Sequence, residues 1–140
     1  MKKILLLLFL VSMFSCSSDN DTNIDETSDI VTINGNVTYK ENNTTKPDSY
    51  SQFFLFTEIP HFEDYNFVDG LLVHKTNSGK INAHRRGTVT EYGTVTFEAD
   101  PAKNCVVIVV SNHFTDKVDV KKYSEIKAGQ TINHKVVFEP

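Results

Sequence analysis

Five histidines and two cysteines are the side chains of this sequence best suited to metal binding or catalysis. The histidines occur at none of the spacings, such as H-E-x-x-H, that place two imidazoles on one metal ion. The sequence also lacks the G-x-S-x-G motif of serine hydrolases and the complete P-loop of nucleotide-binding proteins. We therefore expect no catalytic residue, no metal and no cofactor. A metal site assembled in space from His74 and His84 stays open, and with it the alternative of a small hydrolase or metal-dependent enzyme.

An aromatic and acidic segment at residues 61–67 is the strongest candidate for recognition. Rigid aromatic rings supply contact area at low cost in conformational entropy, and neighbouring carboxylates suit a sugar. The candidate ligand-binding residues are Phe62, Glu63, Asp64, Tyr65 and Phe67. The alternative is that the rings pack beneath the segment while the acids stay in water.

Three consecutive basic residues, His84, Arg85 and Arg86, form a second candidate site. Arginine forks bind carboxylate or phosphate well, so these residues are candidates for anion binding. The alternative is a charged strand edge that deters pairing with another chain. The chain as a whole carries 14 Lys and Arg against 18 Asp and Glu, so we expect no nucleic-acid partner.

Cys105 opens a run of valine and isoleucine that is apolar at every position. A strand of this kind lies in the middle of a structure with both faces covered. We expect Cys105 to be a buried, unreactive thiol, and the outer face to be covered by the long connection 58–70 or by a partner protein. His134 shares the parity of Ile132 and Val136 in the last predicted strand, which makes it a core-edge histidine.

The N-terminus has the pattern of a secretion signal: two lysines, an apolar run at residues 4–11, and then Ser15 and Cys16. Eight residues of helix rise only about 12 Å, which is too short to cross a bilayer. The segment around Ser15 and Cys16 resembles the lipobox of bacterial lipoproteins, with Met13 and Phe14 departing from its commonest form. The resemblance implies that Cys16 is lipidated and anchors the protein to a membrane. Ordinary secretory cleavage near Ser15 is the alternative.

Residues 17–29 contain five acids and a single large apolar residue, Ile24. Such a segment cannot bury enough apolar surface to fold, so we expect a flexible tether. Ser18, Asp19 and Asp21 resemble the export signal that sends some lipoproteins to the outer membrane and the cell surface. From Ile30 onward there are 12 bases and 13 acids, so the domain itself is close to neutral.

Apolar and polar residues alternate with a period of two through most of residues 30–140, which predicts half-buried strands. The expected strands are residues 31–39, 50–57, 71–76 with a continuation at 80–85, 88–98 as one or two strands, 105–111, 117–123 and 131–138. Turn-forming residues separate them. We therefore predict an all-β fold, a Greek-key sandwich of seven strands, with three regions: signal peptide 1–15, lipidated cysteine and tether 16–29, and sandwich 30–140.

Several short motifs in this region follow the order of a known family. They are Gly35-Asn36-Val37-Thr38, Lys46-Pro47, residues 90–97, Asp100-Pro101-Ala102-Lys103-Asn104, residues 105–110 and Ala128-Gly129-Gln130. The region is similar to the carboxypeptidase regulatory-like, or transthyretin-like, β-sandwich, although Cys105 stands where the family has Tyr. The resemblance implies an immunoglobulin/transthyretin-like fold and a non-catalytic binding or accessory module. The chain also ends without the Tyr-Arg-Gly-Ser of the hydrolases that share this fold.

These observations combine into one expectation: an outer-membrane or cell-surface lipoprotein, held on the membrane through Cys16, whose sandwich binds a protein, peptide or glycan.

Overall fold

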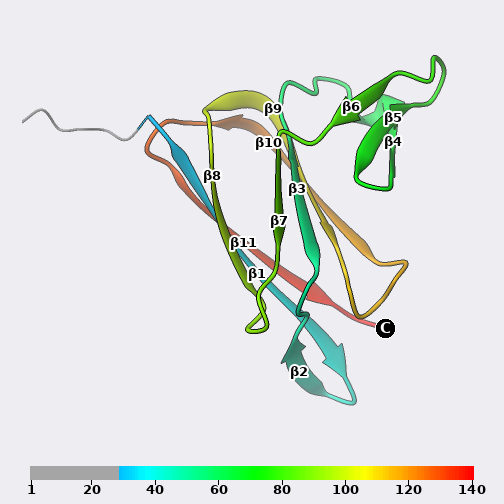
Figure 1. The fold of residues 1–140 in the computed structure, drawn as a ribbon, viewed down its shortest axis with the longest axis vertical. Helices are drawn as coiled ribbons and strands as arrows, with labels where there is room; N and C mark the ends of the chain where they lie inside the picture. The colour runs from blue at the N-terminus through cyan, green and yellow to red at the C-terminus, as the bar shows by residue number, and fades with distance from the viewer. Residues whose placement is uncertain (1–28) are drawn as a thin grey trace, which may run out of the picture.

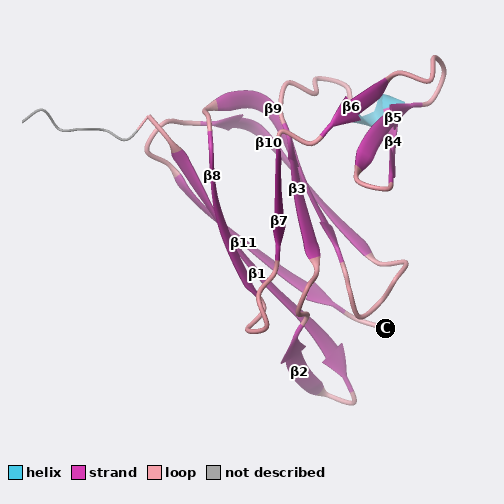
Figure 2. Cartoon of the chain, in the orientation of Figure 1, coloured by secondary structure: helices cyan, strands magenta, loops and turns pink. Residues whose placement is uncertain are grey.

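The computed structural model describes residues 29–140, whose regular structure is strand apart from one short 3-10 turn (Figures 1 and 2). The elements are β1 (Val31–Glu41), β2 (Thr44–Pro47), β3 (Gln52–Phe56), η1 (Phe62–Asp64), β4 (Tyr65–Val68), β5 (Leu71–His74), β6 (Lys80–Asn82), β7 (Arg85–Thr88), β8 (Thr94–Ala99), β9 (Ala102–Val110), β10 (Val118–Ile126) and β11 (Thr131–Phe138). No helix within residues 29–140 has the length and apolar character needed to span a bilayer. The candidate residues Cys16, Ser18, Asp19 and Asp21 lie outside the described residues.

Two sheets pack face to face to form a β-sandwich. In sheet A, β1 lies between β8 and β11, and the exposed strand β2 pairs with the end of β1. The pairing of β1 with β11 is parallel, and the other pairings in this sheet are antiparallel. Sheet B has the strand order β10-β9-β3-β7 and is wholly antiparallel. The prediction of an all-β sandwich is therefore confirmed.

The core between these sheets follows from the alternation of the strands. The inward residues of β1 are fully buried against Phe53 and Leu55 of β3 and against every second residue of β9. Gly35 interrupts the apolar inward row of β1 because the ring of Phe53 occupies its place. A Cβ atom at Gly35 would lie 2.4 Å from that ring, which is well inside van der Waals contact. Glycine here permits the two sheets to approach each other.

A second apolar core lies on the outer face of sheet B. Strands β4, β5 and β6 form a small sheet C, which Figure 1 shows beside one end of β3 and β9. Leu72 and the ring of Phe67 from sheet C pack against Phe54, Phe56 and Ile108 of sheet B. β9 is apolar on both faces because sheet C covers its outer face. The cover is therefore a segment of the same chain, as the first of the two alternatives predicted.

Residues 29–140 contain eleven strands where the sequence predicted seven. Seven strands do form the body of the sandwich, and the additional ones are β2, β4, β5 and β6. The region 58–70, predicted to be a connection, contains η1 and β4. All four residues of β2 are exposed, so no apolar alternation marks that strand in the sequence.

Candidate functional site

The aromatic segment faces the second core. Phe62, Tyr65 and Phe67 are each half-buried against the apolar cluster over sheet B. The ring of Phe67 meets Phe54 edge-on, with centroids 5.2 Å apart. Tyr65 packs edge-on against His74 at 5.0 Å. The arrangement favours the packing alternative for these three rings.

The acids of the same segment face solvent, as that alternative expects. Glu63 lies 3.7 Å from the Nζ atom of Lys122 on β10, and the same Nζ stands 5.2 Å from the centroid of Phe62. No hydrogen bond or ion pair engages the carboxylate of Asp64 within residues 29–140. These contacts attach η1 to β10 and do not enclose a ligand site.

The basic candidates are not brought together. Successive residues of a strand point to opposite faces, so Arg85 and Arg86 diverge. Arg85 donates to the carbonyl of Glu98, and its guanidinium lies 3.8 Å from the carboxylate of Asp100. Arg86 reaches the opposite face, where it lies 5.5 Å from the ring centroid of Phe54.

His84 stands beside Arg85, with Nε2 3.4 Å from the same Asp100 carboxylate. Two of the three basic groups are thus already paired with an acid. As the edge strand of sheet B, β7 fits the alternative of a charged edge.

His134 is buried, as its parity predicted. Its Nδ1 lies 3.1 Å from the hydroxyl of Tyr123, and its Nε2 lies 3.1 Å from Asp119. Both contacts reach from sheet A to sheet B, so this histidine links the two sheets at their edge. Among residues 29–140, no three His, Cys, Asp or Glu side chains converge in a way that could hold a metal ion.

The thiol of Cys105 is 1% exposed, and its Sγ lies 3.5 Å from the carbonyl of Lys103. Burial, assisted by the charge of Glu58, raises the pKa of this thiol to about 11. The thiolate is the reactive form, so Cys105 is chemically inert at neutral pH.

A groove at one end of the sandwich combines aromatic and polar side chains, and sequence reasoning missed it. It lies at the end of the sandwich that carries β2 (Figure 1), where three loops meet: residues 48–51, 89–93 and 111–117. We call it the end groove. Its volume is about 380 Å³, and it is lined by Tyr39, Pro47, Asp48, Ser49, Tyr50, Asn112 and His113.

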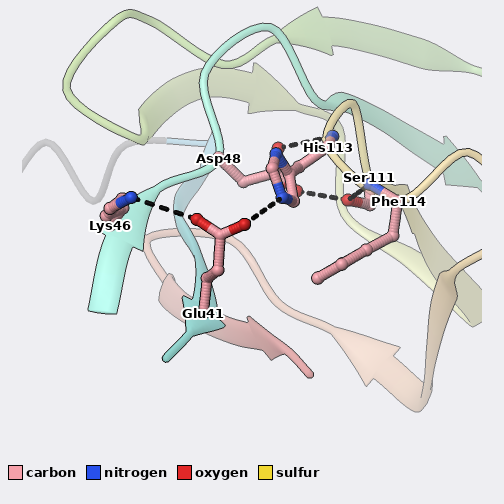
Figure 3. Close-up of polar contacts among 6 residues, drawn as sticks. All are labelled: Glu41, Lys46, Asp48, Ser111, His113 and Phe114. Atoms are coloured by element: carbon pink, nitrogen blue, oxygen red, sulfur yellow. Dashed lines mark hydrogen bonds and ion pairs between the residues drawn. The ribbon is translucent and has the colours of Figure 1, made fainter. Parts of the chain in front are cut away.

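Asp48 fixes the floor of the end groove (Figure 3). Its side chain is buried; one carboxylate oxygen accepts a hydrogen bond from the hydroxyl of Ser111, and the other accepts from the backbone N–H of His113 at 3.0 Å. Ser111 in turn accepts from the N–H of Phe114 at 2.9 Å. These bonds hold the loops 48–51 and 111–117 in one conformation.

Serine, histidine and aspartate meet here, but not in the order of a catalytic relay. The hydroxyl of Ser111 donates directly to Asp48, whereas the imidazole Nε2 of His113 lies 4.0 Å from Glu41. A relay needs the histidine between the hydroxyl and the carboxylate. The cluster therefore positions the loops and has no arrangement for nucleophilic attack.

One wall of the end groove is aromatic. The rings of Tyr39 and His113 are stacked, with centroids 3.8 Å apart and planes 12° from parallel. Phe114 meets His113 edge-on at 4.7 Å. The carboxylate of Glu41 lies beside this wall (Figure 3). It accepts a hydrogen bond from Lys46 at 3.1 Å and lies 4.0 Å from Nε2 of His113.

Tyr50 stands at the rim of the end groove in a conformation that bulky residues rarely adopt. Its φ is +66°, in the left-handed region, and its side chain is 61% exposed. The backbone N–H donates to Val89 at 3.0 Å, and the hydroxyl of Ser49 donates to the carbonyl of Glu91 at 2.9 Å. The neighbouring loop thus holds the backbone in place, and the ring of Tyr50 is presented to solvent.

The polar groups left available in the end groove are those of a binding site. No hydrogen bond engages the side chains of Tyr50 or Asn112 within residues 29–140, so both are free for a ligand. The carboxylate of Asp48 is fully used by its partners. The groove therefore offers ring faces, an amide and a hydroxyl, without a buried, unpaired charge.

Comparisons with known proteins assign no family. No family model matches the chain, and no curated protein sequence matches it. Among solved structures, the minor pilin GBS52 of Streptococcus agalactiae is similar, with 11% identity and a TM-score of 0.44 over 81% of this chain and 45% of that one. A 9R-lipoxygenase from Cyanothece PCC8801 is similar at 12% identity and a TM-score of 0.38, over 77% of this chain and 16% of that one.

The chain thus spans less than half the length of either structure that it resembles. The packing of its two sheets makes the described part of the chain an all-β sandwich domain, and its likeness to the minor pilin and the lipoxygenase is distant. These likenesses extend to the general fold and give no specific function.

Proposed function

We propose that the protein is a non-catalytic lipoprotein of the outer membrane or cell surface whose sandwich binds a carbohydrate in the end groove. The observation that carries this proposal is Tyr50, which holds an unfavourable backbone conformation and presents its ring at the rim of a preformed groove. Backbone strain of this kind persists only where the surrounding structure imposes it, and it is concentrated at functional sites.

The chemistry of the end groove suits a sugar. Tyrosine rings offer flat apolar faces to the C–H groups of a pyranose, and the free amide of Asn112 can donate to one hydroxyl while it accepts from another. A volume of about 380 Å³ lies in the range of small-ligand sites. The locked loops lose little entropy on binding, which favours affinity.

The position of the end groove fits the proposed membrane anchor. β1 begins at Val31, directly after the predicted tether, and reaches the groove at Tyr39. Eight residues of strand cover about 26 Å, so the groove lies at the far end of the sandwich from the tether. A protein held through Cys16 would present the end groove away from the membrane.

The family resemblance fits the same proposal. The seven strands β1, β3 and β7 to β11 would form the transthyretin-like Greek key, and β2 and sheet C would be additions to it. Members of that family are mostly accessory or binding modules, which agrees with a sandwich that binds without catalysis.

A binding screen tests the proposal. We suggest titrating the purified full-length lipoprotein, in a detergent without a sugar headgroup, against a panel of neutral and acidic oligosaccharides by calorimetry. Tyr50→Ala should weaken the binding of any positive oligosaccharide at least about tenfold, since a central anchor residue contributes on the order of 2 kcal/mol.

Tyr92→Ala is the matched control for this experiment. Tyr92 is 74% exposed on the adjoining loop but does not line the groove, so its removal should leave the affinity unchanged. Equal losses in both variants, or none in either, would count against the end groove as the site.

A further inference from the structure

The outer face of sheet A, which no element within residues 29–140 covers, has a composition that its fold does not require. Eight of its eleven outward residues are threonine or asparagine; the full set is Thr32, Asn34, Asn36 and Thr38 of β1, Thr94, Thr96 and Glu98 of β8, and Thr131, Asn133, Lys135 and Val137 of β11. Threonine is common in strands, but asparagine is depleted there. The three asparagines on paired positions of β1 and β11 therefore point to a role other than strand formation.

A shallow trough of about 320 Å³ crosses this face at right angles to the strands. One wall is the row Thr96–Asn34–Asn133, and the other is the row Thr94–Asn36–Lys135, as the register of the three strands dictates. The floor between the rows is formed by Gly35 and by Val95 and His134, whose side chains are buried. The trough thus passes over β8, β1 and β11 in turn.

The first wall is held rigid by its own hydrogen bonds. The hydroxyl of Thr96 donates to the amide oxygen of Asn34 at 2.9 Å, and the amide nitrogen of Asn34 donates to Asn133 at 3.3 Å. These two hydrogen bonds leave the amide nitrogen of Asn133 without a partner among residues 29–140. On the second wall, no hydrogen bond or ion pair within residues 29–140 engages the side chains of Asn36 and Lys135.

We infer that this trough is a second binding site, and that its ligand is a linear, neutral polysaccharide chain. The walls offer amides, hydroxyls and one amine, a mixed set of donors and acceptors that matches a row of sugar hydroxyls. Adjacent strands lie about 4.8 Å apart, close to the length of one pyranose unit, so successive sugars would meet successive strands.

Other ligand classes fit the trough less well. A peptide would require deep apolar side-chain pockets or an open strand edge, whereas the trough lies in the middle of a sheet face and Val95 is the one apolar side chain among the residues that line it. A nucleic acid would require several cations, and the basic side chains among the residues that line the trough are Lys135 and the buried His134. The absence of an aromatic ring there separates this site from the end groove, which is where Tyr50 would hold a sugar face-on.

The test is affinity electrophoresis of the full-length lipoprotein in native gels. The gels would contain one of four neutral polysaccharides with linear backbones: a mixed-linkage β-glucan, an arabinoxylan, a galactomannan or pullulan. The double variant Asn36→Val with Asn133→Val removes the free amides and raises strand propensity, so it should stay folded. We expect at least a fivefold loss of retardation in one gel.

Thr32→Val with Thr131→Val is the matched control, since these residues pair on the same two strands one row outside the trough, and it should run as the wild type. Repeating the gels with Tyr50→Ala separates the two sites. If adding Asn36→Val and Asn133→Val to Tyr50→Ala reduces the retardation further, the trough binds the polysaccharide, even if the end groove binds nothing. Equal mobility of wild type and the asparagine variant in all four gels, with unchanged circular dichroism, would overturn the inference.

Discussion

Tyr50 combines a strained backbone conformation with a ring that is exposed at the rim of the end groove. A bulky residue in the left-handed region costs on the order of 1–3 kcal/mol, and glycine adopts the same backbone freely. Nothing in the packing requires a ring at this position, because the side chain is mostly exposed. The residue is best explained by what its ring contacts outside the chain.

The strain gives a first prediction. Tyr50→Gly should raise the free energy of unfolding by about 1 kcal/mol while it abolishes ligand binding, because the left-handed backbone is relaxed and the ring is lost. Urea denaturation measures the stability. Tyr92→Gly, at a position without a positive φ, should give no such gain. A Tyr50→Gly variant that is less stable than the wild type would show that the ring supports the fold.

Cys105 gives a prediction about alkaline pH. Because the folded state raises the pKa of this thiol from 9.0 to about 11, folding favours the protonated form. The stability that this provides is complete below pH 9 and is lost as the pH rises towards 11, a change of roughly 2–3 kcal/mol.

Urea midpoints at pH 8 and pH 10.5 measure this change. Burial, together with the charge of Asp119, raises the pKa of Tyr123 as well, so the wild type should lose stability from two groups. Cys105→Ala should retain only the smaller loss. An identical decline in wild type and variant would contradict the assigned burial of the thiol.

At the scale of elements, the contact between β1 and β3 is the tightest constraint on the sandwich. Gly35→Ala should destabilise the protein by about 1–3 kcal/mol, because the added methyl group would overlap both Phe53 and Val95. Thermal unfolding measures the effect. Gly79→Ala is the control, since the nearest side chain there is the flexible Asn77 at the surface. Equal melting temperatures for the two variants would mean that the sheets can move apart at low cost.

The long strands were predictable because each keeps one polar and one apolar face. The predicted residues 31–39 and 131–138 lie within β1 and coincide with β11. β2 was missed because it is exposed on all sides, and β4 because Tyr65 and Phe67 looked like ligand contacts rather than the buried face of a strand. Whether an aromatic residue packs or binds is decided by what lies opposite it, which the local sequence does not contain.

The end groove could not be predicted for a related reason. Asp48 and Ser111 lie 63 residues apart in the chain and meet only because β3 pairs with β9. The sequence places Tyr50 at the start of the predicted strand 50–57, and no local signal marks its positive φ. The trough was partly predictable, since the alternation of apolar and polar residues indicated which residues face outward. Its rows depend on the register of three strands, two of which are separated by most of the chain.

For the whole molecule, we propose a nearly neutral sandwich on an acidic tether that is lipidated at Cys16. Cys16→Ser should move the protein from the membrane fraction to the soluble fraction, because serine lacks the sulfur atom that would carry the lipid anchor. Fractionation with antibody detection measures this. The Cys105→Ala variant should remain with the membrane, and unchanged fractionation of Cys16→Ser would contradict the lipid anchor.

The central claim is that the end groove binds a carbohydrate. It is tested most directly by nuclear magnetic resonance of the isotope-labelled full-length protein, titrated with the oligosaccharide that binds best in the calorimetric screen. The account predicts that the largest amide shifts fall on Ser49, Tyr50, Asn112 and His113, which come from two separate loops of one groove. Shifts confined to residues 61–67 of the aromatic segment, with none at the end groove, would contradict it.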